Sequence, residues 1–225
     1  MKKQMNQNLG VGCVLVPDII DEVFEKLPSG IDWVEASPSL FSFLNPGRPD
    51  IFIQSLIEIS KHSSLGIHFL NLNIGSTDPI LKSTVQCLKK YHSWIKPLHI
   101  SDHMGWRSVG GKQIIEMLPP PFTKRSVSNI SDRIKFYQDV IGEKMLIENV
   151  ACCAYFASSE MPECEFLSQV SEESGCGLIL DISNIVISAH NIGFDAHEFI
   201  NGLDPSQIQQ LHIAGYIERD GYLVD

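Results

Sequence analysis

Histidine and carboxylate side chains recur at or near the ends of short apolar segments along most of this chain. They are Glu35, His68, Asp102, His103, Glu148, Asp181 and His212, with the amide residues Asn149 and Asn184 beside two of them. Imidazoles and carboxylates are ligands for metal ions, and amide oxygens can serve in the same way. The pattern predicts a metal site if the fold brings these side chains together.

Charge balance favours this interpretation over a purely structural one. A single histidine in an apolar segment, such as His68 or His212, is more often a buried core residue, and a single glutamate often pairs with an arginine. Here Arg107 is the only basic residue close to any of these segment ends. Gathering carboxylates and imidazoles without counter-charge costs several kcal/mol, and a multivalent cation removes that cost. Mixed ligation of this kind suits iron, manganese or zinc better than magnesium or calcium.

The elements that must position these side chains alternate between short apolar segments and longer amphipathic ones. This alternation predicts βαβ units and a parallel sheet covered on both faces. We expect strands within Val11–Val16, Ile31–Glu35, Leu65–Leu72, Pro97–Ile100, Met145–Glu148, Gly177–Asp181 and Gln209–Ile213. We expect helices within Asp50–His62, Pro79–Ile95, Ser128–Ile141, Glu163–Ser174 and Ala196–Leu203.

The spacing of these units favours a (β/α)8 barrel of the TIM type over a doubly wound open sheet. The turn after the first strand lacks the glycine-rich phosphate fingerprint of open sheets. A closed barrel takes about 250 residues, so we expect one domain over residues 1–225 that lacks its eighth strand and is incomplete at the C-terminus. The carboxyl ends of barrel strands converge on one mouth, which would gather the candidate ligands there.

Composition excludes several functional classes. The net charge of -10 argues against nucleic acid, whose phosphates require clustered lysine and arginine. The N-terminus has no apolar signal segment, and no apolar run has the length of a membrane span. The six cysteines form no Cys-x-x-Cys pair and do not indicate a disulfide framework. These features predict a cytoplasmic protein that binds neither nucleic acid nor membrane.

Six segments, in a fixed order, resemble motifs of the multinuclear non-haem iron-dependent oxidative enzymes. This family, once of unknown function, includes the methanobactin-forming oxidase. The resemblance extends over nearly the whole chain from Leu9 onward. The segments are His99–Trp106, Met117–Thr123, Leu146–Asn149, Gly177–Asn184, Ser188–Asp195 and Leu211–Tyr216. A seventh segment, Met161–Leu167, resembles the start of a linking helix in the same family.

The resemblance implies a barrel that holds two or three iron ions and uses dioxygen to oxidise a side chain, typically cysteine, of a ribosomally made precursor peptide. It also implies a small partner protein that recruits the precursor. Matched motif by motif, the implied metal ligands are His68, His103, Glu148, Asn184, His212 and Asp225, with Asp102 and Asp181 as further ligands or as partners of a ligand. We expect Glu148 to bridge two metal ions, and Glu148 and Asp102 to be the catalytic residues.

Three departures from the family pattern leave two alternatives open. Ile192 and Tyr216 occupy positions where the family has histidine, and Asp225 ends the chain where the family continues with further ligands. One alternative is a metal-dependent hydrolase or isomerase of the sugar-isomerase type, in which a metal-bound water does the chemistry. The other is a truncated, non-catalytic barrel that only binds metal.

Overall fold

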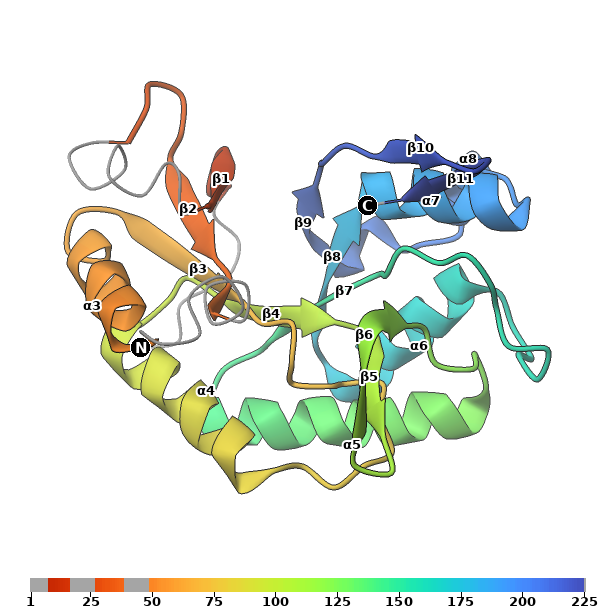
Figure 1. Ribbon diagram of the computed structural model, residues 1–225, viewed down its shortest axis with the longest axis horizontal. Helices are drawn as coiled ribbons and strands as arrows, with labels where there is room; N and C mark the ends of the chain where they lie inside the picture. Colours follow the sequence, from red (N-terminus) through yellow and green to blue (C-terminus); the bar gives the residue numbers. More distant parts are fainter. Residues whose placement is uncertain (1–7, 17–26, 39–48, 225) are drawn as a thin grey trace. The chain divides into compact units, whose positions relative to one another are not determined.

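The computed structural model describes residues 8–16, 27–38 and 49–224, which form parts of two compact units (Figure 1). The first unit comprises residues 1–70 and 87–100, and the second comprises residues 71–86 and 101–225. Whether the whole chain acts as one domain stays a prediction. None of the described helices is both long and apolar enough to cross a membrane.

The first unit contains three parallel strands that pair in chain order. β1 (Gly12–Leu15) pairs with β2 (Trp33–Ala36), and β2 pairs with β3 (Ser64–His68). Nearly every residue of β2 and β3 is buried, as expected for strands covered on both faces. Helix α3 (Pro49–Ile59) lies between β2 and β3 in the chain, and α4 (Lys82–Ile95) follows β3. Each helix buries apolar residues at helical spacing.

The second unit repeats this plan with four parallel strands in chain order. They are β4 (Ile100–His103), β7 (Leu146–Glu148), β8 (Gly177–Asp181) and β9 (Ile208–His212). The helices of this unit are α5 (Lys124–Ile141), α6 (Glu163–Ser174), α7 (Ile182–Ile192) and α8 (Ala196–Asn201), with a short 3-10 turn, η2 (Pro205–Gln207). Long helices α5 and α6 pack side by side (Figure 1).

Capping residues set the limits of these helices. Thr123 caps α5, since its hydroxyl oxygen accepts a hydrogen bond from the Ser126 amide at 3.1 Å. The predicted start of this helix at Ser128 was therefore wrong, because the threonine before it already satisfies the first turn. The predicted end of this helix at Ile141 is confirmed, and Gly142 follows it with a φ of 74°, the left-handed conformation that glycine adopts at helix ends.

Two antiparallel hairpins lie outside the predicted pattern. β5 (Trp106–Val109) and β6 (Lys112–Leu118) follow the end of β4, and β10 (Ile217–Arg219) and β11 (Tyr222–Val224) follow the end of β9. β11 packs against α7 (Figure 1). Gly110 and Gly111 close the first hairpin, and both have positive φ as a two-residue hairpin loop requires.

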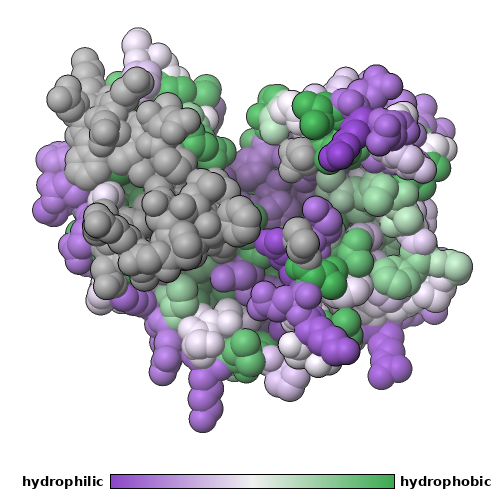
Figure 2. Space-filling model, in the orientation of Figure 1, coloured by the Kyte–Doolittle hydropathy of each residue, from purple (hydrophilic) through white to green (hydrophobic). Residues whose placement is uncertain are grey.

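The α/β class and the parallel sheet are confirmed. The expected strand at Pro97–Ile100 lies further along the chain, at Ile100–His103, and α7 was not predicted. The described residues contain no eighth parallel strand. In and between β9 and β10 of the second unit, the apolar residues Leu211, Ile213 and Ile217 are exposed. Figure 2 shows apolar areas on the surface of the molecule, among polar ones.

Candidate metal centre

Each of the four parallel strands in the second unit ends on a side chain that can ligate a metal. His103 ends β4, Glu148 ends β7, Asp181 ends β8 and His212 ends β9. The strand register places His103 opposite Glu148, and Asp181 opposite His212. Because the carboxyl ends of neighbouring parallel strands meet at one edge of a sheet, four separate stretches of sequence supply one cluster.

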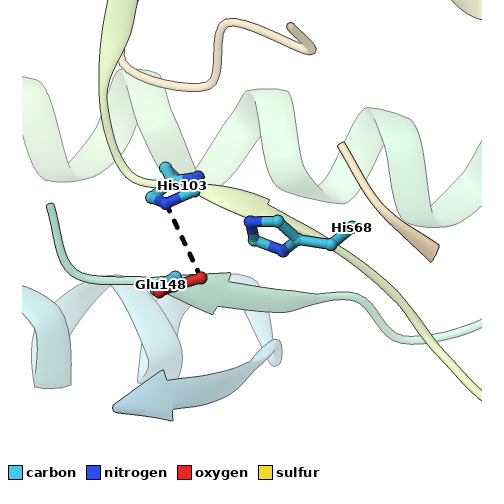
Figure 3. A group of neighbouring side chains, drawn as sticks. All are labelled: His68, His103 and Glu148. Carbon is cyan, nitrogen blue, oxygen red and sulfur yellow. Dashed lines mark ion pairs between the residues drawn. The ribbon is translucent and has the colours of Figure 1, made fainter. Parts of the chain in front are cut away.

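Glu148 is the central residue of this cluster. Its Oε1 lies 3.0 Å from Nδ1 of His212, and its Oε2 lies 3.7 Å from Nε2 of His103 (Figure 3). The glutamate side chain is 2% exposed, whereas the imidazoles of His103 and His212 are 17% and 18% exposed. A buried carboxylate therefore directs its two oxygens to two different imidazoles, each of which keeps an open side.

Asp181 adds a second carboxylate to the same group. One ligand atom from each of Glu148, Asp181 and His212 lies within 4.8 Å of the others. Burial raises the pKa of Asp181 to about 6, and the neighbouring charge of Glu148 acts in the same direction. Two carboxylates in such proximity repel one another unless a proton or a cation lies between them.

A first-row transition metal fits this donor set. Two carboxylates and two imidazoles provide oxygen and nitrogen ligands in the mixture that iron, manganese and zinc accept. The Gln210 side chain lies against His212, with its Nε2 2.7 Å from Nε2 of the imidazole. The Nδ1 atom of the same imidazole lies 3.0 Å from Oε1 of Glu148.

Asp102 lies beside this cluster and bonds main-chain groups. Its carboxylate accepts hydrogen bonds from the amides of Leu72 at 2.7 Å and His103 at 2.6 Å. Its side chain is 1% exposed, and burial raises its pKa to about 8 despite these two bonds. These contacts hold the backbone at His103, while the catalytic role expected for Asp102 stays a prediction.

The remaining predicted ligands occupy different surroundings. His68 is the buried last residue of β3 in the first unit and is also drawn in Figure 3. Asn184 lies in the first turn of α7, where its side-chain Nδ2 donates to the main-chain oxygen of Asn149 at 2.9 Å. Asp225 lies outside the described residues. The ligand roles of all three stay predictions.

A second glutamate–histidine pair lies in the first unit. Nε2 of His99 is 3.0 Å from Oε2 of Glu35, with both side chains at least 96% buried. The edge of the Trp33 ring packs on the His99 imidazole, with ring centroids 5.4 Å apart. Sequence reasoning identified Glu35 as a candidate strand-end residue but left out His99, its partner, which lies 64 residues away.

Sequence reasoning also overlooked Gln210 and the hydrogen bonds of Asn149. A signal for Gln210 was available, because it lies two residues before His212 in the same strand and therefore on the same face. Asn149 follows Glu148 directly, but its partners come from β8 and α7, more than 30 residues away. No local pattern in the sequence indicates bonds of that range.

Two sets of similar proteins bear on this site. Among curated relatives, one from Anaeromyxobacter sp. (strain Fw109-5) is 37% identical over 87% of this chain and 68% of its own length. Another, from Psychromonas ingrahamii, is 30% identical over 97% of this chain and 75% of its own length. Both are named only as UPF0276 proteins.

Solved structures of similar fold are enzymes of the TIM-barrel, xylose-isomerase-like kind. D-psicose 3-epimerase from Clostridium cellulolyticum H10 has a TM-score of 0.56 at 16% identity, covering 91% of this chain and 72% of the epimerase. Endonuclease IV from Thermus thermophilus has a TM-score of 0.54 at 13% identity, covering 90% of this chain and 75% of the endonuclease. At such identities the likeness establishes the fold alone, and it confirms the predicted barrel type.

The family model that matches this chain is described as "RiPP precursor modification enzyme MbnB/TglH/ChrH", where RiPP denotes a ribosomally synthesised and post-translationally modified peptide. The match covers residues 10–225. Together with relatives more than 30% identical over most of the chain, this match confirms the resemblance found in the sequence motifs. The chain belongs to the RiPP precursor modification enzyme family MbnB/TglH/ChrH.

Proposed function

We propose that this protein is a non-haem iron enzyme that oxidises a side chain, such as that of cysteine, in a ribosomally made precursor peptide. Dioxygen is the oxidant and accepts the electrons removed from the side chain. The observation that carries the proposal is the position of Glu148, which directs one carboxylate oxygen to His103 and the other to His212. Family membership supports the peptide substrate.

Two overlapping groups of side chains would hold the metal ions. Glu148, Asp181 and His212 form one group. Glu148 and His103 belong to the other. His68, the last residue of β3, is a further proposed ligand on the strength of the sequence resemblance alone. In this scheme Glu148 bridges the groups, and Asn184 and Asp225 supply further ligands. Iron bound there would supply the one-electron redox chemistry and oxygen activation that protein side chains lack.

The protein residues orient the ligands and leave room for the substrate. Asp102 fixes the backbone at His103 through the His103 amide, and the Gln210 side chain packs against the His212 imidazole. The partial exposure of both imidazoles leaves one side of the cluster accessible to a peptide side chain. A substrate thiol would enter as the thiolate, the form that binds metals. In this proposal, a small partner protein recruits the precursor in the cytoplasm.

The decisive experiment starts with anaerobic purification and metal analysis. We expect iron in the protein, and oxygen consumption after addition of a precursor peptide encoded near this gene, with a matching mass change in the peptide. The matched comparison is the same protein loaded with zinc, which should consume no oxygen. Zinc alone at full occupancy in the isolated protein, with no oxygen consumption after reconstitution with iron, would refute the iron oxidase.

A further inference from the structure

Three residues at the ends of β7 and β8 bond one another in a closed cycle. The Asn149 side chain bonds both main-chain groups of Asp181: its Oδ1 accepts from the Asp181 amide at 2.8 Å, and its Nδ2 donates to the Asp181 carbonyl at 3.1 Å. Oδ1 of Asp181 accepts from the Asn184 amide at 2.8 Å. The Asn184 side chain donates back to the Asn149 carbonyl at 2.9 Å.

This cycle extends the pairing of β7 and β8 beyond its last main-chain partners. The register of the two strands ends with Glu148 opposite Ile179. The side-chain amide of Asn149 then bonds the amide and the carbonyl of Asp181 as a neighbouring strand would. All three residues of the cycle are at least 93% buried, so water does not compete for these bonds.

The cycle lies between two of the candidate ligands. Asn149 is the residue after Glu148, and Asp181 is itself a candidate ligand. The bond from the Asn184 amide caps α7 and occupies one carboxylate oxygen of Asp181, which holds that side chain in one orientation. Breaking the bonds of Asn149 would therefore free the backbone that sets the separation of the two carboxylates.

We propose that Asn149 is a positioning residue of the metal centre. Its side chain fixes the separation of Glu148 and Asp181 through two hydrogen bonds to the Asp181 main chain. This inference rests on the proposed function, because it concerns the same metal ions. Residues that orient metal ligands typically change metal affinity about 10–100-fold when they are substituted. We expect a change of this size for Asn149→Ala, although Asn149 ligates no metal.

The chain offers a matched control at the opposite end of β7. The Gln138 side chain also bridges two main-chain groups: its Oε1 accepts from the Met145 amide at 3.0 Å, and its Nε2 donates to the Ser174 carbonyl at 2.9 Å. Met145 directly precedes the first residue of β7, whereas Glu148 is the last. Gln138→Ala therefore removes two similar bonds without disturbing the carboxyl end of the strand.

The test measures Fe²⁺ binding by the full chain under anaerobic conditions, in competition with a chelator, alongside urea unfolding of the metal-free protein. We expect both alanine variants to lower the urea midpoint, and only Asn149→Ala to raise the Kd for Fe²⁺, about 10–100-fold. Asn149→Asp keeps the size of the side chain and the bond from the Asp181 amide. It should give an intermediate Kd, and it serves as the test if the alanine variant does not fold.

Two results would overturn the inference while leaving the proposed function intact. One is a Kd for Fe²⁺ within about twofold of wild type in Asn149→Ala and Asn149→Asp. The other is an equal loss of affinity in Gln138→Ala, which would show that Asn149 acts through general stability. A wild-type chain that binds no Fe²⁺ would instead refute the proposed function, and the positioning role with it.

Discussion

The two units of this molecule each contain a glutamate–histidine pair with a 3.0 Å contact, yet the two pairs differ in their surroundings. Glu35 and His99 are at least 96% buried, and a tryptophan ring packs against the imidazole. Glu148 is equally buried, but its partners His212 and His103 are 18% and 17% exposed. Among the residues that the structure describes, only the second pair has a further carboxylate, Asp181, within ligand distance.

This difference shows which property indicates a metal site. We call Glu35 with His99 the closed pair, because both side chains are covered; the imidazole and the carboxylate bond each other, and the pair contributes to folding. We call Glu148 with its partners His212 and His103 the open pair, because one carboxylate contacts two imidazoles from different strands, and each imidazole keeps an accessible side. Contact between a histidine and a carboxylate is thus insufficient evidence of function. The number of convergent ligands and their exposure distinguish the two pairs.

We expect the largest effect on metal binding when the glutamate of the open pair is substituted, and no such effect when the glutamate of the closed pair is substituted. Glu148→Gln keeps the size of the side chain but removes the charge shared between His103 and His212, so bound iron should fall to near zero. Glu35→Gln makes the same change in the closed pair and should leave the iron content unchanged. Metal analysis of both variants after anaerobic reconstitution makes the comparison. Equal iron in Glu148→Gln and wild type would end the distinction between the pairs.

The closed pair should show the larger effect on stability. His99→Ala removes the imidazole from a buried glutamate and leaves a cavity beside Trp33. Removing one partner of a buried hydrogen-bonded pair in this way costs roughly 3–5 kcal/mol of unfolding free energy. Urea unfolding should show this loss, with iron content per folded protein unchanged. His212→Ala is the counterpart in the open pair. It should lower the iron content per folded protein, and it should lower the free energy of unfolding by less than His99→Ala does. Reversed effects in the two variants would contradict our assignment of the pairs.

Strand-end chemistry was predictable from sequence because it follows from topology. Once a parallel sheet is expected, the last residues of its strands must converge, and His103, Glu148, Asp181 and His212 could be identified as one cluster without coordinates. The limits of α6 and β8 were also correct, because each stands between clear turn signals. These features depend on local patterns and on one general rule of barrel architecture.

Other features were not predicted from the sequence, because they depend on partners that are distant in the chain or on residues with two roles. The Glu35–His99 contact joins positions 64 residues apart, and the Asn149 bonds cross 32 residues. Helix α7 was missed because Asp181 both ends a strand and caps the following helix, which leaves no connecting loop between them. The hairpin strands β5, β10 and β11 have only three or four residues each, too few for alternation to indicate them.

A third buried glutamate, Glu163, extends the comparison to a buried carboxyl group that has a tyrosine as its partner. Its pKa is raised to about 7 by burial, although a hydrogen bond from Tyr155 opposes the shift. A raised pKa means that the folded state binds more protons than the unfolded state between pH 4.5 and 7. Stability from this group is therefore complete below pH 4.5 and is lost as the pH rises through 7, by up to roughly 3 kcal/mol. Glu163→Gln should remove this pH dependence in urea unfolding, and an unchanged slope would refute the assignment.

The smallest predicted effect concerns the hydroxyl that serves Glu163. The Tyr155 hydroxyl donates to Oε2 of Glu163 at 2.7 Å, and this bond is stronger when the carboxyl is ionised. Tyr155→Phe should therefore cost about 1 kcal/mol of stability at pH 5 and about 2 kcal/mol at pH 8. Iron content should stay at the wild-type level, because neither residue belongs to the metal-ligand groups of the described chain. An equal cost at both pH values would mean that Glu163 keeps one protonation state throughout, since only its ionisation makes the bond depend on pH.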